Sequence, residues 1–449
     1  MVNPTPGAAN RRPALSGRVP VLPALLALLL TSAPGSPSAL LTPPFSHTLG
    51  FQRIGRYYLR LYLGSGFRVD DPQGMCGAKM TEEDDPTTSR DDHILTLFGV
   101  NSGTGQIVYN VKLLEPRIYG SEGPGTGEFR QPHGIACNPE GDVYVADTGN
   151  DRLVRLRYAG GRLVWVSVPD AALAAPRDVA LDSRNRVYVT EYGADRVVVL
   201  DSSGARLAAW SGELDRPTGI AVIDQAAPYN QYGTDAAVVV DRDGRRLSLF
   251  SLDGRLRRQV DIRRLGLTEG EFSYAAFDRH GNCYVTDQLA DQVHVFDPEL
   301  AHIVSFGDDS RFNSPRGILL WRRFGQLFVN EAEGGQYYWV GLDGYLIGCY
   351  PAEFDSRRPG TTIALYVTGV ADIEVHVTDA AGRLVRALTP PHDQRPGEVL
   401  IVWDGLDDRG ALVPVGEYQV HAVIRPTYST PRRIHKKELA GTVRRVADR

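Results

Sequence analysis

Acidic side chains recur at the ends of short apolar segments, and each is followed five residues later by arginine or glutamine. Carboxylates beside guanidinium groups occur in active sites, but an active site needs one asymmetric arrangement, whereas this pair is repeated. A repeated pair is better explained as a hydrogen-bonded fork that holds a turn in place. We therefore predict a structural role for the pairs, which are Asp147 with Arg152, Glu191 with Arg196, Asp241 with Arg246, Asp287 with Gln292 and Glu331 with Gln336.

A second motif lies upstream of each acid and begins at Pro132, Pro176, Pro217, Phe272 and Pro315. The residue after its first position is expected near the start of an innermost strand, so these residues should ring one mouth of a central channel. Such a mixed polar and cationic ring could receive an anionic peptide or glycan, although channels of this kind are generally polar whatever they bind. The candidate ligand-binding residues are His133, Arg177, Thr218, Ser273 and Arg316.

The spacing of the acids predicts how the elements that carry them are arranged. Successive acids are 44, 50, 46 and 44 residues apart, which is close to the length of a four-stranded propeller blade. A weaker copy, Leu97 to Asn101 with Gln106, precedes them and makes six. One blade cannot bury both of its faces alone, so the blades must stack, and closing the ring protects their edges.

The best copy of the repeat consists of GEFRQPHGIA from Gly127 and GDVYVADTGNDRL from Gly141. It resembles an NHL repeat, and the resemblance extends over about 92–350. NHL domains are six-bladed propellers, so the resemblance implies the same number of blades as the spacing. It does not imply one function, because NHL domains serve as RNA-binding modules, protein-interaction modules, extracellular sensors and lyases.

The lyase branch of these propellers holds a metal with histidines that face the channel. Only His133 occupies the channel motif, and the equivalent positions carry Arg177, Thr218, Ser273 and Arg316, so a three-histidine site is not expected. No GxSxG, phosphate-binding loop or HExxH motif occurs either. We predict no catalytic residue, no metal and no cofactor, and we keep as the alternative a secreted lyase or glycan-acting enzyme with a metal in the channel.

Residues 360–426 have a different pattern of alternating strands and turns. DAAGRLVRAL from Asp379, WDGLDDRG from Trp403 and VGEYQV from Val415 resemble the Ig-like domain of the flagellar hook-capping protein. The resemblance implies a small β-sandwich with a surface or assembly role. Residues 427–449 are rich in lysine and arginine and are interpreted as a solvated basic tail, with a helix on an anionic surface as the alternative.

The N-terminal region predicts export. Arg11, Arg12 and Arg18 precede an apolar stretch from Val19 to Leu30 that is too short to span a membrane, so residues 1–39 are interpreted as a signal peptide. The destination would be the periplasm, the cell surface or the medium. In the segment 40–92, residues Tyr57 to Leu63 have strand composition and could close the ring.

The four cysteines are too few and scattered for a disulfide framework. Cys137 and Cys283 fall in opposite blades of the expected 93–350 propeller, too far apart for the roughly 4.4–6.8 Å between Cα atoms that a disulfide needs. Cys283 replaces a strand valine and is expected in the core. Ring closure could bring Cys76 and Cys349 together.

Composition agrees with a folded all-β chain, since 42% of the 449 residues are apolar and 23% are charged. The net charge of −5 gives no general reason to bind nucleic acid. The sequence therefore predicts a six-bladed propeller followed by an Ig-like sandwich, in an exported, non-catalytic binding or surface-assembly protein. Its partner would be a protein or glycan at a propeller face, and the sequence does not indicate an oligomeric state.

Overall fold

The computed structural model describes residues 41–42, 53–85, 87, 94–233, 235–266, 270–309, 311–428 and 435–448. The expected signal peptide, residues 1–39, lies outside them. Strands dominate the described residues, which confirms the all-β prediction. The helices found there are α1 (Arg56–Leu63) and the short 3-10 helices η1 (Thr81–Glu83), η2 (Ser102–Thr104), η3 (Thr148–Asn150), η4 (Tyr192–Ala194) and η5 (Ile262–Leu265).

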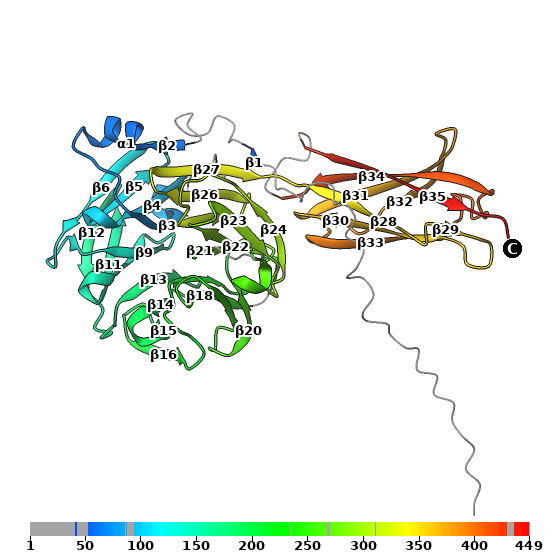
Figure 1. Cartoon of the computed structure of the whole chain (residues 1–449). Helices are drawn as coiled ribbons and strands as arrows, with labels where there is room; N and C mark the ends of the chain where they lie inside the picture. Colours follow the sequence, from blue (N-terminus) through cyan, green and yellow to red (C-terminus); the bar gives the residue numbers. More distant parts are fainter. Residues whose placement is uncertain are drawn as a thin grey trace, which may run out of the picture. The chain divides into compact units, whose positions relative to one another are not determined.

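Antiparallel sheets follow one another along the first three quarters of the chain (Figure 1). The first contains β3 (Pro72–Lys79), β4 (Leu95–Asn101), β5 (Gln106–Val111) and β6 (Glu115–Tyr119), and the second contains β9 (Pro132–Cys137), β10 (Asp142–Asp147), β11 (Arg152–Ala159) and β12 (Arg162–Ser167). The short parallel pair β7 (Ser121–Glu122) and β8 (Glu128–Phe129) lies between them in sequence. The third contains β13 (Pro176–Leu181), β14 (Val187–Glu191), β15 (Arg196–Leu200) and β16 (Arg206–Ser211).

The next sheets repeat this order. The fourth contains β17 (Gly219–Ile223), β18 (Ala236–Asp241), β19 (Arg246–Phe250) and β20 (Leu256–Asp261), and the fifth contains β21 (Phe272–Phe277), β22 (Cys283–Asp287), β23 (Gln292–Phe296) and β24 (His302–Phe306). The sixth contains β25 (Ile318–Trp321), β26 (Gln326–Glu331) and β27 (Gly334–Val340), and β1 (Leu41–Thr42) and β2 (Arg53–Gly55) both pair with β27.

The first strands of these sheets, β3, β9, β13, β17, β21 and β25, contact one another in turn, and β25 also contacts β3. Apolar side chains of neighbouring sheets form a separate core at each interface. One valine recurs in these cores, two residues before the acid: Val145, Val189, Val239, Val285 and Val329 are all fully buried. The repeated strand thus places its apolar residues between sheets and its acid at the strand end.

The N-terminal segment differs from expectation in two ways. Residues 57–63, expected as a strand, lie in helix α1, because the half-buried Leu59 and Leu63 are four residues apart and share one helix face. The strands of the N-terminal segment that pair with the sixth sheet are instead β1 and β2, which precede α1 in the chain. The first sheet also begins at Pro72, inside the segment 40–92, and not at residue 93.

The C-terminal part consists of two sheets that share one core. The first contains β28 (Gly344–Tyr350), β30 (Thr361–Val367) and β33 (Gly397–Trp403), and the second contains β29 (Glu353–Phe354), β31 (Ala371–Asp379), β32 (Leu384–Leu388), β34 (Gly416–Pro426) and β35 (Lys437–Arg445). Ile363 and Trp403 from the first sheet and Val375 and Val420 from the second are all buried in the shared core. Alternate residues along each strand therefore face the other sheet.

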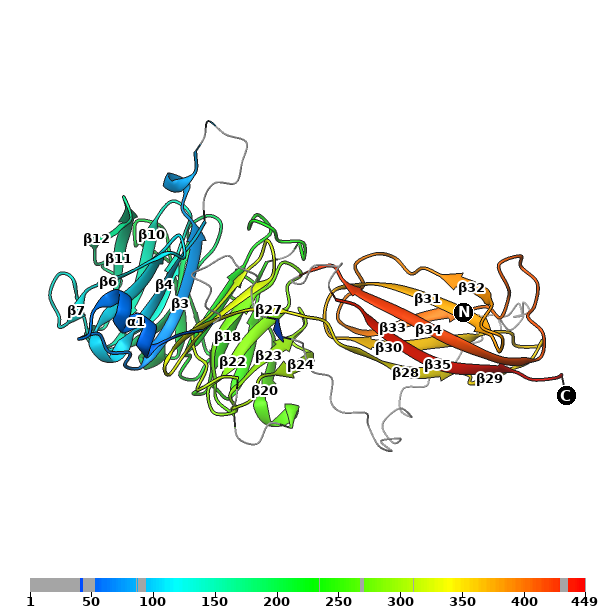
Figure 2. The ribbon, with the colours of Figure 1, turned by 90° about the horizontal axis from the view of Figure 1, so that it is seen from above.

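The expected basic tail contains a strand. Residues Lys437–Arg445 form β35, which pairs with β34 over nine residues and is drawn in red in Figure 2. Its residues alternate in exposure, with Val443 in the core and charged side chains such as Glu438 and Arg444 outward. Only Leu439 and Val443 of this strand pack against the core, and so few apolar residues explain why the sequence alone indicates a solvated tail.

All four cysteines are free. Cys349 lies in β28 within the core of the C-terminal sheets, whereas Cys76 lies in β3 within the core of the first two sheets, so the pairing of Cys76 with Cys349 that ring closure could have allowed does not occur. Cys137 packs against the same core as Cys76, and burial raises the pKa of the Cys76 thiol well above its usual value. Cys283 is fully buried, as predicted for a core residue.

Candidate functional site

The repeated acids are buried at strand ends, where they tie each sheet to the segment that enters it. Asp147 is fully buried and accepts hydrogen bonds from Arg152 Nε at 2.7 Å, from the backbone N–H of Arg130 at 2.7 Å and from Asn150 Nδ2 at 2.8 Å. Arg152 also donates to the carbonyl of Pro124 at 2.7 Å. The pair thus closes a turn through charge-assisted hydrogen bonds.

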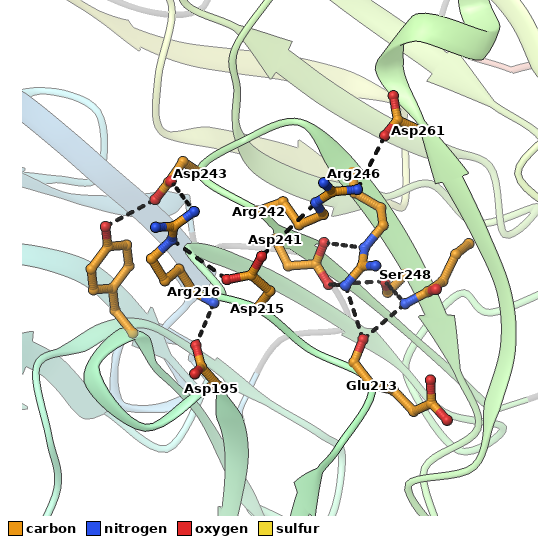
Figure 3. A network of polar contacts seen from close by, with 12 residues as sticks. Asp195, Glu213, Asp215, Arg216, Asp241, Arg242, Asp243, Arg246, Ser248 and Asp261 are labelled. Atoms are coloured by element: carbon orange, nitrogen blue, oxygen red, sulfur yellow. Dashed lines mark hydrogen bonds and ion pairs between the residues drawn. The ribbon is translucent and has the colours of Figure 1, made fainter.

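The same arrangement recurs in the fourth sheet, where Figure 3 shows both oxygens of Asp241 engaged. Arg246 donates through Nε at 2.7 Å and through Nη2 at 2.9 Å, and Ser248 adds a bond at 3.1 Å. Arg246 also reaches the carbonyl of Glu213 at 2.9 Å. With its donors all belonging to the fold, this carboxylate has little capacity left for a ligand.

The remaining acids show how the pattern varies. Glu191 is hydrogen-bonded to Arg196 and to the backbone N–H of Ala174. Glu331 receives the Gln336 amide at 2.7 Å and also Arg53 from β2 at 2.7 Å. In the fifth sheet the sequence predicts Gln292 as the partner of Asp287. The side chain that contacts this acid is instead His294, whose Nε2 lies 3.3 Å from Asp287 Oδ2.

The residues predicted at the channel mouth lie together. One pocket of about 310 Å³ is lined by all five of them, namely His133, Arg177, Thr218, Ser273 and Arg316. They come from five different sheets or the segments that enter them, so no single stretch of chain builds the pocket. Strand register brings them together, because each lies at the equivalent position near the start of the first strand of its sheet.

Sequence reasoning missed the contribution of the first sheet to this pocket. Asp71 and Gln73 also line it, and Gln73 occupies the position equivalent to His133. The motif that begins at Pro72, PQGMC, resembles PHGIA at Pro132, but it precedes Asn101 by 29 residues where Pro132 precedes Asp147 by 15. Allowing for a long loop after the first strand would have found it.

Arg177 and His133 form the cationic part of the pocket. Arg177 Nη1 contacts His133 Nε2, while His133 Nδ1 lies 2.8 Å from the carbonyl of Gln131. Burial and the neighbouring Arg177 charge lower the pKa of His133 to about 4, so the imidazole is neutral at ordinary pH. The guanidinium carbon of Arg177 also lies 4.9 Å from the centre of the Tyr192 ring.

The acidic side chains of the pocket already have partners. Asp71 is paired with Arg316 and accepts a bond from Gln73 at 3.0 Å. Asp243 lies 2.8 Å from Arg216 and accepts a bond from the Tyr192 hydroxyl, and Glu271 is bonded to Gln288.

Of the two arginines that line the pocket, Arg177 therefore differs from Arg316. The Nε atoms of both arginines are buried without a hydrogen-bond partner, but Arg316 is paired with Asp71, whereas within the described ranges the Arg177 guanidinium makes no ion pair. A cation that faces a neutral histidine and an aromatic ring is suited to receive a carboxylate.

Two side chains narrow the space between the innermost strands. Asp178 and Tyr274 occupy the motif position where the other sheets have Gly74, Gly134, Gly219 and Gly317. Asp178 accepts bonds from the backbone N–H groups of Ile220 and Val179 at 2.8 Å, and the Tyr274 hydroxyl donates to Gln73 Oε1 at 3.1 Å. Burial raises the pKa of Asp178 to about 7.

In the described part of the chain, no three His, Cys, Asp or Glu side chains are grouped closely enough to hold a metal ion. His133 is bonded within the mouth, and His294 lies between Asp287 and Ser305. Glu83 of η1 accepts a bond from the Tyr158 hydroxyl at 2.6 Å. No described helix has the length and apolar character needed to cross a membrane.

Two family models match parts of the chain. The NHL repeat matches residues 129–156, and the FlgD Ig-like domain matches residues 355–425. No curated protein matches the chain at a significant level. The chain thus contains an NHL repeat and a FlgD Ig-like domain, which confirms both resemblances.

Solved structures to which this chain is similar include a streptogramin B lyase, which is 16% identical with a TM-score of 0.42 over 55% of this chain and 76% of that chain. Virginiamycin B lyase from Staphylococcus aureus is 15% identical with a TM-score of 0.41 over 56% of this chain and 78% of that one. PorZ, a surface component of the type IX secretion system of Porphyromonas gingivalis, is 13% identical with a TM-score of 0.43 over 86% of this chain and 53% of that one.

Proposed function

We propose that this chain is an exported, non-catalytic binding protein whose six sheets are the blades of a closed propeller. The mouth pocket would receive a carboxylate from an acidic segment of a protein partner, and the Ig-like domain would serve surface attachment or assembly. The observation that carries the proposal is the position of Arg177, a cation without an acidic partner among the described residues, in a pocket to which every sheet contributes.

The chemistry of the pocket supports recognition more than reaction. Each of its acids has a partner, namely Arg316, Arg216 or Gln288, and a carboxylate held by an arginine is a weaker general base than a free one. The imidazole of His133 is held by Gln131 and Arg177. The half-buried guanidinium of Arg177 is already held by His133 and Tyr192, so it loses little side-chain freedom when a carboxylate binds, which favours a charge-assisted contact.

Replacing Arg177 with alanine should weaken binding of an acidic peptide at least about tenfold, since a hydrogen bond to a charged group contributes roughly 1.5–3 kcal/mol. Calorimetric titration of the full chain with an oligoglutamate peptide tests this, with an oligoglutamine peptide of equal length as the uncharged control. Affinity for oligoglutamate should also fall as salt is added.

The matched control is Arg162→Ala, which removes an exposed arginine from β12. It should leave the affinity for oligoglutamate unchanged, and both variants should melt within a few degrees of the parent. Equal binding by Arg177→Ala and the parent would contradict the proposal. Binding of an oligogalacturonate in place of the peptide, lost in Arg177→Ala, would identify a glycan as the source of the carboxylate.

A further inference from the structure

A second pocket lies where the last sheet meets the first. Its volume is about 150 Å³, and its walls come from β4 and β5 on one side and from β26 and β27 on the other. Ile54, Leu59, Phe67 and Val69 of the N-terminal segment also line it. None of the channel-mouth residues contributes to its lining, so it is a separate site.

The pocket exists because the first sheet lacks two side chains that fill the other interfaces. In the first sheet Asn110 of β5 is the strand partner of Leu97. At the equivalent position the second to fifth sheets each have a large, buried apolar residue, namely Leu156, Leu200, Phe250 and Phe296. Gly99 occupies the position of the recurrent buried valine. The core at this interface is accordingly small, with Leu95, Leu113, Phe328 and Tyr337 as its buried residues.

The walls favour an aromatic occupant. The rings of Phe67, Phe328 and Tyr337 line the pocket, and the last two are stacked with centres 4.4 Å apart. A dry cavity of roughly 150 Å³ lined by leucine, isoleucine and phenylalanine is large enough to bind benzene. The volume therefore suits a single aromatic ring.

One acceptor in the pocket is left without a donor. Asn110 Oδ1 is buried and has no hydrogen-bond partner among the described residues. Other polar side chains of the lining are engaged: Asn330 Nδ2 donates to the carbonyl of Gln73 at 3.2 Å, and Gln336 Nε2 donates to Glu331 at 2.7 Å. The Tyr337 hydroxyl accepts a bond from Trp339 Nε1 at 3.1 Å. An unpaired buried acceptor is costly, and a ligand donor at that atom would remove the cost.

We propose that this pocket binds a small aromatic molecule with one hydroxyl or N–H group, which donates to Asn110 Oδ1 while its ring lies among Phe67, Phe328 and Tyr337. The inference does not depend on the function proposed for the channel mouth. The ligand class follows from the size of the pocket, its aromatic lining and the unpaired acceptor of Asn110.

Phenol and toluene are suitable probes because they have nearly the same shape and differ in the donor. Titration of the full chain, followed by calorimetry and by the rise in melting temperature, should show phenol binding on the order of tenfold more tightly than toluene. Failure of both probes to bind at millimolar concentration would overturn the proposal, and so would equal affinity for the two.

Two substitutions at one position separate the volume from the acceptor. Asn110→Leu gives the first sheet the leucine that the second and third sheets have at the equivalent positions, Leu156 and Leu200. This side chain fills the pocket, so the variant should fold at least as stably as the parent and bind neither probe. Asn110→Ala keeps the space and removes the acceptor, so it should bind toluene and lose the preference for phenol. The control is Val164→Leu on the exposed face of β12, with unchanged binding expected. Unchanged phenol binding by a folded Asn110→Leu variant would refute the assignment.

Discussion

Replacing Asp147 with alanine should lower the free energy of unfolding of the propeller part by about 3–5 kcal/mol, the range for breaking a buried charge pair. Three donors lose their acceptor at once: Arg152 Nε, Asn150 Nδ2 and the backbone N–H of Arg130. Arg152 is only 17% exposed, so water replaces the lost carboxylate poorly. Urea unfolding followed by intrinsic fluorescence would measure the loss.

The control is Glu140→Ala, which removes an exposed acid from the turn between β9 and β10 of the same sheet. It should change stability by about 0.5 kcal/mol or less, as surface substitutions usually do. Comparing the unfolding midpoint of Asp147→Ala with its oligoglutamate binding distinguishes a structural pair from a binding site. If Asp147→Ala lost oligoglutamate binding while its unfolding midpoint stayed at the parent value, the pair would belong to the binding site.

The repeat could be predicted because each sheet obeys the same local rule. An apolar strand is buried on both faces between neighbouring sheets, and its last residue must bring an acid to the turn. Both requirements therefore produce the same residue pattern, an apolar strand that ends in an acid, at a nearly constant spacing in the sequence. The channel-mouth residues could be predicted for the same reason, since register alone carries His133 and its equivalents to one pocket.

The misplaced elements are those whose structure depends on distant partners. The loop after β3 separates Pro72 from the rest of its sheet, so local spacing conceals the first strand. Residues 437–445 form β35 because β34 offers a free edge, and no local pattern signals that edge. The helix α1 has tyrosines and leucines that suit a strand equally well, and packing of Leu59 and Leu63 decides the outcome.

The contacts within the sites were beyond sequence reasoning. The pairing of Asp71 with Arg316 joins residues 245 positions apart, and it is this pair that leaves Arg177 as the cation without an acid. The aromatic pocket likewise appears only when Asn110 is compared with Leu156 and Phe250 in register. A polar residue in a strand, such as Asn110, is unremarkable in the sequence, and its effect on packing can be judged only once the neighbouring sheet is known.

Asp178 should make the propeller less stable as pH rises, and Asp178→Asn should remove that dependence. Its carboxyl has a pKa of about 7 in the folded chain, raised by burial, against about 4 for an exposed aspartate. Between these values the folded state holds the proton and the unfolded state releases it, so stability falls with rising pH. Below pH 4 both states are protonated, and above pH 7 both are ionised.

The expected size follows from about 1.4 kcal/mol for each pKa unit, so the parent should lose on the order of 3 kcal/mol relative to Asp178→Asn between pH 4.5 and 8. The comparison with the variant is needed because His133, with its pKa lowered to about 4, acts in the opposite direction: it stays neutral when folded, so stability falls as pH drops from 6.5. Urea midpoints of the parent, Asp178→Asn and the exposed control Glu140→Gln, measured across this range, give the difference directly. Parallel pH profiles for the parent and Asp178→Asn would show that the buried carboxyl is ionised throughout, held by the N–H groups of Val179 and Ile220.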